Sequence, residues 1–218
     1  MTGARAGSWS DDLYGAALTT GRGRLFLRVT NGRLLRMDID RWCARADACD
    51  LAVLRRCDGP VLDIGCGAGR LVEALSRRGQ RVLGIDVCSA AVVSTLQRGG
   101  PARRVSVFDA LPEEGMWGTA LLLDGNIGIG GDPTALLGRT RQVVRPGGLL
   151  LVETADTDAD ARYRVRIDDG LGNRGALFPW AVVGRRALHG HAVARGWRVT
   201  ECWTTSRGRH FSVLTAQT

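Results

Sequence analysis

Val61-Leu62-Asp63-Ile64-Gly65-Cys66-Gly67-Ala68-Gly69-Arg70 is the stretch that decides the fold of this 218-residue chain. Apolar residues around Asp63 predict a buried strand that ends beside a carboxylate, and residues 71–75 predict the start of an amphipathic helix. Glycines at alternate positions join the two elements, because such turns use positive φ angles and because side chains would keep a ligand at a distance. A strand, a glycine turn and a helix in this order are typical of the first crossover of a nucleotide-binding α/β sheet.

The spacing of these glycines indicates which ligand the turn binds. A dinucleotide-binding turn has the pattern G-x-G-x-x-G and receives a pyrophosphate, but here Gly69 comes one residue early. Asp63 precedes the first glycine by two residues, where a carboxylate would repel a pyrophosphate and attract an ammonium group. The pattern resembles motif I of the class I S-adenosylmethionine (SAM)-dependent methyltransferases, in which an acidic residue precedes a G-x-G-x-G loop. Another Rossmann-type loop, or a plain tight turn, is the alternative.

Two acidic residues further along the chain fit the same family. The predicted strand over residues 81–86 ends at Asp86, where a carboxylate can accept hydrogen bonds from both ribose hydroxyls; a helix N-cap is its alternative role. Asp109 follows a predicted strand over residues 104–108. The resemblance implies that Asp109 contacts the adenine amino group, with Ala110 and Leu111 beside the ring; an ordinary turn is the alternative. The resemblance also implies cofactor contacts for Asp63, Gly65, Cys66, Gly67 and Val87.

The loop after the predicted strand 119–123 follows a strand end, where open α/β sheets bind their ligands. In class I methyltransferases the sulfonium and the acceptor meet here, so the resemblance implies that Asp124 and Gly125 contact the cofactor and Asn126 the acceptor. Methyltransferases of DNA and RNA amino groups carry an Asn/Asp-Pro-Pro-aromatic motif at this place. Ile127 follows Asn126 instead, which counts against a base amino group as acceptor. The R-P-G-G turn at residues 145–148, before a strand over 149–153, also resembles this family.

Flanking segments predict a cap over the ligand cleft. A short helix over residues 11–18 is capped by Ser10, Asn31-Gly32 joins strands over 24–30 and 33–38, and a helix covers 39–57. Tyr14 and Arg22 are candidates to reach the cofactor or substrate, although Tyr14 could instead pack the cap onto the sheet. An insertion near residues 160–184 contains strands over 162–167 and 176–183. Its Phe178 and Trp180 either line the acceptor pocket or fill the core.

These elements predict an α/β fold with a Rossmann-like, seven-stranded, mostly parallel sheet, helices on both faces and an antiparallel last strand. The last elements are a helix over residues 185–195 and strands over 197–203 and 210–216. Residues 1–7 are small and polar and are expected to fray. We expect a cap over residues 1–58 and a SAM-binding core over 59–218.

Composition limits the classes of partner. The net charge of +8 is typical of proteins that bind nucleic acid. Here, however, every basic residue is arginine and the arginines are scattered, so a nucleic-acid partner is not expected. No apolar run is long enough to span a bilayer and the N-terminal residues do not have the basic-then-apolar pattern of a leader, so we expect no membrane contact and a cytoplasmic protein. None of the six cysteines forms a C-x-x-C motif, so no metal site is expected.

The resemblance implies an enzyme that transfers the methyl group of SAM to a small-molecule acceptor, most readily at oxygen, with S-adenosylhomocysteine as product. Asn126 and His210 are the catalytic candidates, with Asp124, Asp132 and Glu153 as alternatives, although each histidine could simply be a surface residue. An RNA or protein acceptor, or a SAM-binding protein without methyltransferase activity, is the alternative function. A monomer or homodimer is expected.

Overall fold

The computed structural model describes residues 13–217, so the helix cap predicted at Ser10, residues 11 and 12, and the segment predicted to fray lie outside the described residues. The elements follow in the order α1 (Leu13–Thr20), β1 (Leu25–Val29), β2 (Leu34–Met37), α2 (Ile39–Cys43), α3 (Ala48–Leu54), β3 (Val61–Ile64), α4 (Arg70–Ser76), β4 (Val82–Asp86), α5 (Ser89–Gln97), β5 (Ala102–Arg104), β6 (Trp117–Leu122), the 3₁₀ helix η1 (Asn126–Gly128), α6 (Pro133–Val143), β7 (Val144–Thr154), β8 (Asp160–Asp168), β9 (Phe178–Val183), α7 (Arg185–Val193), β10 (Trp197–Thr204) and β11 (His210–Ala216).

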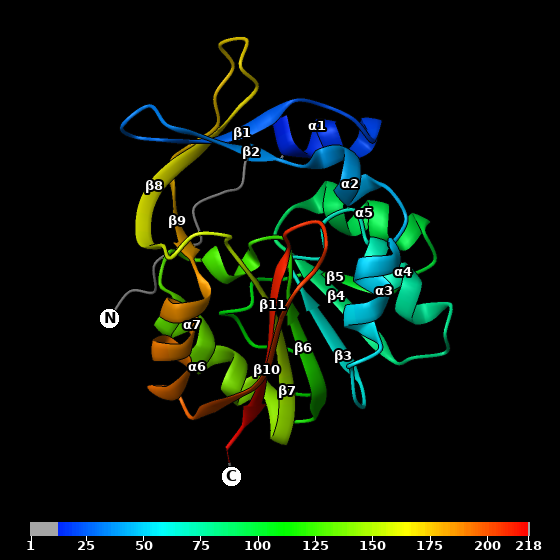
Figure 1. Cartoon of the computed structure of the whole chain (residues 1–218). Helices are drawn as coiled ribbons and strands as arrows, with labels where there is room; N and C mark the ends of the chain where they lie inside the picture. The colour runs from blue at the N-terminus through cyan, green and yellow to red at the C-terminus, as the bar shows by residue number, and fades with distance from the viewer. Residues whose placement is uncertain (1–12, 218) are drawn as a thin grey trace.

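The larger sheet has seven strands in the order β10-β11-β7-β6-β3-β4-β5 (Figure 1). Its ladders from β7 to β5 are parallel, whereas β11 runs antiparallel to both of its neighbours. The predicted seven-stranded sheet with an antiparallel last strand is therefore confirmed. Strand order reverses between β3 and β6, and the carboxyl ends of strands at such a point form the usual ligand crevice of an open α/β sheet.

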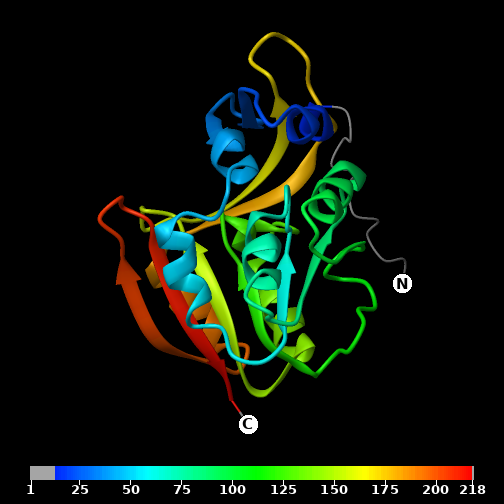
Figure 2. The same cartoon turned by 90° about the vertical axis from the view of Figure 1, so that its right-hand side faces the viewer.

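A second sheet of four antiparallel strands has the order β2-β1-β8-β9 and lies across one end of the molecule (Figures 1 and 2). Its strands come from the cap hairpin and from the insertion, which lie more than 120 residues apart in the chain and pair through β1 and β8. Alternate residues of these strands are buried together, including Leu27, Val165 and Trp180. Burial of this shared apolar face holds the two distant segments together.

Three predicted elements differ from the structure. The strand predicted over residues 104–108 is wrong, because β5 ends at Arg104 and residues 105–109 turn away, with the Asp109 amide donating to the Ser106 carbonyl at 3.0 Å. The helix predicted over 39–57 is two helices, because Ala44 is extended and Asp47 starts α3 with a capping box. The turn predicted at 145–148 is part of β7, beside a register shift against β6.

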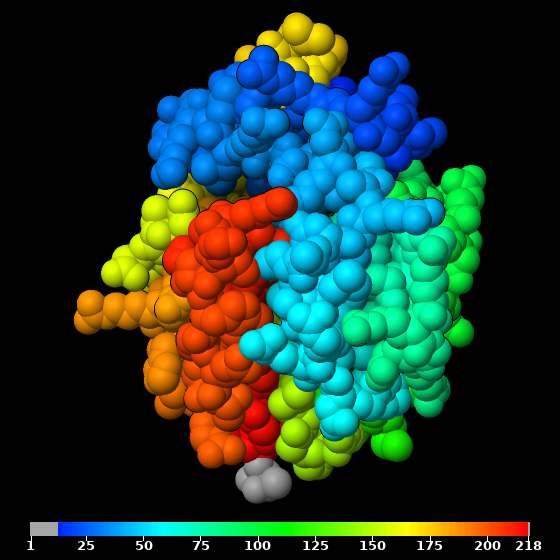
Figure 3. Space-filling model, turned by 45° about the vertical axis from the view of Figure 1, so that its right-hand side comes forward, coloured from blue at the N-terminus to red at the C-terminus, as the bar shows by residue number. Residues whose placement is uncertain are grey.

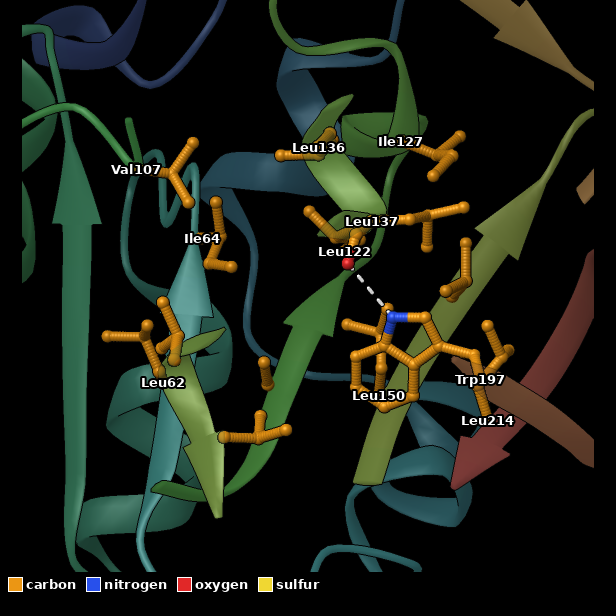
Figure 4. Packing of buried hydrophobic residues seen from close by; sticks show 14 of the residues in the cluster. Leu62, Ile64, Val107, Leu122, Ile127, Leu136, Leu137, Leu150, Trp197 and Leu214 are labelled. Carbon is orange, nitrogen blue, oxygen red and sulfur yellow. Dashed lines mark hydrogen bonds between the residues drawn. The ribbon is translucent and has the colours of Figure 1, made fainter. Parts of the chain in front are cut away.

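The main core lies between the larger sheet and helices α6 and α7, and contains Leu62, Leu122, Leu150 and Leu214 from four different strands (Figure 4). Trp197 of β10 is fully buried in it, and its indole N–H donates a 2.9 Å hydrogen bond to the Leu137 carbonyl in the middle of α6. This bond satisfies the one polar group of a large apolar side chain. A second cluster, with Val72 and Phe211, fills the opposite face under α3 and α4.

Candidate active site

Two cavities lie between the sheets, at the carboxyl ends of β3, β4 and β6. The larger has a volume of about 540 Å³ and the smaller of about 240 Å³, and Tyr14, Gly65 and Asn126 line both. The larger cavity extends over β4 and the segment after β5, whereas the smaller extends over the glycine loop toward α2 and the cap hairpin. Volumes in this range are typical of sites for small ligands and cofactors.

The glycine loop has the close packing predicted for it. Gly65, Gly67 and Gly69 all have positive φ angles, of 72°, 53° and 84°. A Cβ atom on Gly65 would lie 2.7 Å from the Asn126 side-chain nitrogen, which donates hydrogen bonds to the carbonyls of Ile64 (2.8 Å) and Gly65 (3.0 Å). Asn126, predicted as a catalytic residue, therefore uses its amide N–H groups to hold the loop in place. Cys66 and Gly67 line the smaller cavity.

Asp86 and Asp109 both line the larger cavity, as does Val87. One Asp86 oxygen accepts from the Gly67 amide at 3.0 Å and the other from the Cys88 amide at 2.9 Å, so the carboxylate fixes the glycine loop relative to β4. The N-cap of α5 is Cys88 and not Asp86. Of the two predicted neighbours of the adenine ring, Ala110 is exposed outside the cavity, and Leu111 lies in the main core because the chain leaves the sheet after Arg104.

A network of charged side chains closes the far side of the smaller cavity. Arg70, only 4% exposed, donates to Asp50 at 3.1 Å and to Asp124 at 2.7 Å. Arg209 donates to Asp50 at 2.9 Å and to Glu153 at 2.7 Å. These five residues come from α3, α4, the loops after β6 and before β11, and β7. Figure 3 shows the segment before β11 lying beside the α2–α3 region.

The network also fixes the loop after β6. Asp124 and Gly125 line the smaller cavity, and Asp124 has an unusual positive φ of 58°. Its amide donates to Glu153 at 2.8 Å, and its carboxylate accepts from Arg41 of α2 at 2.6 Å in addition to Arg70. These bonds hold a backbone conformation that a residue with a side chain rarely adopts. Local sequence patterns did not predict Arg41, Asp50, Arg70 and Arg209 as site residues, because their pairing joins segments far apart in the chain.

Asp63 lies behind the loop and lines neither cavity. It is only 2% exposed, and its Oδ2 has no hydrogen-bond partner among residues 13–217. Burial raises the pKa of Asp63 to about 7, opposed by Arg70 and assisted by the carboxylates of Asp124 and Asp86. The predicted direct contact of this carboxylate with the ligand therefore has no support in the geometry, and its effect would act through the buried charge.

Tyr14, Phe178 and Trp180 line the cavities and are also part of the cap core, so all three have the packing role considered for them, and their contacts with a ligand stay predictions. The rings of Phe178 and Trp180 meet edge to face with centroids 6.3 Å apart. Burial and the charge of Asp86 raise the pKa of the Tyr14 phenol well above its usual value, so the hydroxyl stays protonated at neutral pH.

His210 and Arg22 are placed away from both cavities. The Nδ1 atom of His210 lies 3.0 Å from the Thr204 hydroxyl and 3.2 Å from the Arg185 guanidinium, so this histidine, predicted as a catalytic candidate, belongs to the β10–β11 edge. Arg22 is exposed before β1. Asp132 caps α6 through bonds to the amides of Thr134 and Ala135, and none of the histidines lines either cavity.

Residues 13–217 contain no group of three or more His, Cys, Asp or Glu side chains that could hold a metal ion. No helix in this part of the chain has the length and apolar character needed to cross a bilayer.

Two curated relatives match part of the chain. The ubiquinone biosynthesis O-methyltransferase of Paracidovorax citrulli is 34% identical over 110 residues, which are 46% of this chain and 45% of that protein. The enzyme of the same name from Chromobacterium violaceum is 32% identical over 107 residues, covering 46% of each chain. The matched part therefore spans less than half the length of these relatives.

Solved structures match over more of the chain. A SAM-dependent methyltransferase from Bacteroides fragilis, solved with S-adenosylhomocysteine, superposes with a TM-score of 0.80 at 21% identity over 98% of both chains. The 1,6-didemethyltoxoflavin-N1-methyltransferase of Burkholderia thailandensis gives 0.57 at 18% identity, covering 79% of this chain and 77% of that one. At such identities the match shows a shared fold.

The family described as "Methyltransferase domain" matches residues 40–217, which include the glycine loop, both acidic strand ends and the last strand. This match covers most of the chain, and it agrees with the fold and with the motif from which the family was predicted. The chain therefore belongs to the methyltransferase domain family, and the predicted relation to class I SAM-dependent methyltransferases is confirmed.

Proposed function

We propose that this protein binds SAM across the two cavities and transfers its methyl group to a hydroxyl oxygen of a small-molecule acceptor. The observation that carries the proposal is that the cavities meet at Gly65 and Asn126, with Tyr14 lining both. A nucleoside in the larger cavity and an amino-acid tail in the smaller one would bring the sulfonium to this junction.

The larger cavity suits a nucleoside. Asp86 stands at the end of β4 with two oxygens that can accept from the two ribose hydroxyls, and it already fixes the loop that closes over them. Asp109 lies at the far end of the same cavity, where its carboxylate can accept from an adenine amino group. Apolar side chains of Val87, Val105 and Val107 supply the surface against which a flat base can pack.

The smaller cavity suits a methionine tail and not a pyrophosphate. Asp124 and the nearby carbonyl of Gly65 are acceptors for an ammonium group. Arg70, the cation closest in sequence to the glycines, has its guanidinium bonded to Asp50 and Asp124 and is not available to neutralise a phosphate. Cofactor contacts of Gly65, Cys66, Gly67, Asp124 and Gly125 are part of this proposal.

SAM, when bound, supplies a methyl group that its sulfonium already activates, so the chain must orient the acceptor and exclude water. With SAM bound, the acceptor oxygen would form its bond to the methyl carbon as the carbon–sulfur bond breaks toward sulfur, and the hydroxyl proton would pass to solvent. Tyr14 stays protonated and Asn126 holds the loop, so neither takes that proton. Oxygen as the acceptor atom rests on the names of the curated relatives, which are O-methyltransferases.

Calorimetry with S-adenosylhomocysteine and with NAD tests the cofactor. We expect the first to bind and NAD not to bind, and we expect the Asp86→Asn variant to bind S-adenosylhomocysteine about 10- to 100-fold more weakly, because one acceptor oxygen becomes an N–H donor and the other no longer carries charge. Asp58→Asn, which changes an exposed aspartate, should bind as the unchanged protein does.

Formation of S-adenosylhomocysteine from SAM with a panel of phenols, alcohols and amines tests the reaction. Product with hydroxyl acceptors supports the proposal, and product with amines alone contradicts the choice of oxygen. Binding of SAM without turnover of any acceptor would favour a ligand-binding protein of this fold. Tighter binding of NAD than of SAM would contradict the cofactor.

A further inference from the structure

Arg164 of β8 lines the larger cavity together with Leu177, Phe178 and Pro179, and it is exposed there. Among residues 13–217 its guanidinium has neither a hydrogen bond nor an ion pair. Two other charged residues of the strand are paired, since Arg162 lies 3.5 Å from Asp160 and Asp168 is paired with Arg28 and Arg174. A cation without a protein partner beside a cavity can bind an anionic ligand.

Strand pairing shows which way this arginine faces. Arg164 stands directly opposite Pro179 in the β8–β9 ladder, so the two side chains share one face of the second sheet. Pro179 packs against the loop after β6, because a Cβ atom on Gly131 would lie 2.7 Å from the Pro179 Cβ. That loop also pairs with the edge of β9 through an Ile129–Trp180 bridge, and it contributes Ile129 and Gly130 to the cavity that Arg164 lines.

The part of the proposed cofactor that binds in the larger cavity has no anionic group that could pair with Arg164. Its nucleoside is neutral, and the wall formed by β4 and the segment after β5 offers carboxylates, from Asp86 and Asp109, that accept from hydroxyl and amino groups. The only carboxylate of SAM belongs to its methionine tail, which the proposal puts in the smaller cavity, on the other side of Gly65 and Asn126. Arg164 is thus left for the second substrate.

The residues that line the cavity with Arg164 indicate the chemistry of that substrate. Leu177, Phe178 and Ile129 line the same cavity and offer apolar surface, including an aromatic ring. Resting on the proposed function, we propose that the methyl acceptor is an anion: a carboxylate or phosphate group on it binds Arg164, while its apolar, ring-shaped body packs against Phe178 and Leu177.

Binding of small aromatic probes to the protein saturated with S-adenosylhomocysteine tests this assignment without knowledge of the natural acceptor. Benzoate, phenyl phosphate and the neutral benzyl alcohol are titrated and followed by protein NMR. We expect at least one of the two anions to bind about 10-fold more tightly than benzyl alcohol, as one charge-assisted hydrogen bond at a partly exposed site would give. Comparison of the two anions distinguishes a carboxylate-bearing acceptor from a phosphorylated one.

Three variants make the test specific to Arg164. Arg164→Gln should remove the preference for the anion and leave the affinity for S-adenosylhomocysteine within about twofold, and Arg164→Lys should keep most of the preference. Arg162→Gln is the matched control, because Arg162 lies two residues away on the same face of β8 and lines neither cavity.

Several outcomes overturn the assignment. Equal binding of all three probes, no binding of any of them at millimolar concentration, or the same loss of preference in Arg162→Gln would each show that Arg164 does not select an anion. Failure of the unchanged protein to bind S-adenosylhomocysteine would instead contradict the proposed function, and the two failures are thereby distinguished.

Discussion

The two sheets that enclose the cavities build their walls in different ways. Buried charges lie behind the wall formed by the seven-stranded sheet, where Asp50, Asp63 and Arg70 are all less than 5% exposed. The wall from the four-stranded sheet is formed by apolar side chains such as Leu27, Phe178 and Trp180, with an exposed arginine at its edge. One wall is polar and fixed by ion pairs, and the other is apolar and held by the burial of its shared face.

This difference matches the needs of two unlike ligands. A charged cofactor tail gains most from groups that are already oriented and cost nothing to rearrange on binding. An acceptor with an apolar body gains most from burial, which depends little on direction. The difference also predicts that substitutions in the two walls will change different measurable quantities.

Removal of Arg70 should give the largest effect. The Arg70→Met variant leaves the buried carboxylates of Asp50 and Asp124 short of a partner, and we expect the free energy of unfolding to fall by about 3 kcal/mol. Urea denaturation measures this loss. Arg77→Met, which removes an exposed arginine paired with Glu73 one helical turn away, should cost less than about 0.5 kcal/mol. Equal losses of unfolding free energy in the two variants would show that the buried network stabilises the fold no more than an exposed ion pair does.

The buried Asp63 should make stability depend on pH. Its pKa is raised from 3.8 to about 7, so the folded state binds one proton more than the unfolded state between these values. Stability is therefore lost as the pH rises toward 7, by about 2 kcal/mol between pH 5 and pH 8 from this group alone. The Asp63→Asn variant should lack this part of the loss and should be more stable than the unchanged protein at pH 8.

Urea denaturation at pH 5 and pH 8 measures that difference, and comparison of the two proteins cancels the titration of all other groups. Asp58→Asn, an exposed aspartate that pairs with Arg145, is the control and should leave the pH dependence unchanged. An identical pH dependence in the Asp63→Asn variant would mean that this carboxyl group is ionised in the folded state.

The smallest effect is expected from the apolar wall. Asp168 is 1% exposed and holds Arg28 of β1, Arg174 and the Gly170 amide, so it joins the cap hairpin to the insertion. Asp168→Asn keeps the shape and removes the charge, at a cost of about 1 kcal/mol. We expect faster amide hydrogen exchange in β1 and β8 and unchanged exchange in β6 and β7.

Asp160→Asn, which changes an exposed residue at the other end of β8, should alter neither set of amides. Faster exchange throughout both sheets in the Asp168→Asn variant would show that the two sheets unfold as one unit, and the distinction between the walls would then not extend to their stability.

The parts of the fold that were predicted correctly are those that local patterns specify. The strand, turn and helix at residues 61–76 follow from apolar residues and glycines within a few positions of one another. The strand over residues 104–108 was wrong because its alternating pattern is equally suited to a segment that lines a cavity. The helix over 39–57 was wrong because apolar periodicity continued through Ala44 while the Asp47 cap was not recognised.

The position of the candidate site residues beside the cavities also follows from local sequence patterns. Gly65, Gly67, Asp86, Asp109 and Asp124 all line the cavities. Asp86 ends β4, and Gly65 and Asp124 follow the ends of β3 and β6, because a parallel sheet brings its carboxyl ends to one edge, whereas Asp109 lies in the irregular segment after β5. Their contacts with a ligand stay predictions.

The sequence by itself determined the parallel sheet, the glycine turn and the row of carboxylates at the strand ends, because each depends on residues close together in the chain. Only the tertiary structure decided that the cap hairpin and the insertion form one sheet, that Asp63 is buried without a partner on one oxygen, and that Arg164 faces the larger cavity. These features depend on contacts between segments far apart in sequence. Periodicity shows which face of a strand is apolar, but not which distant face it meets.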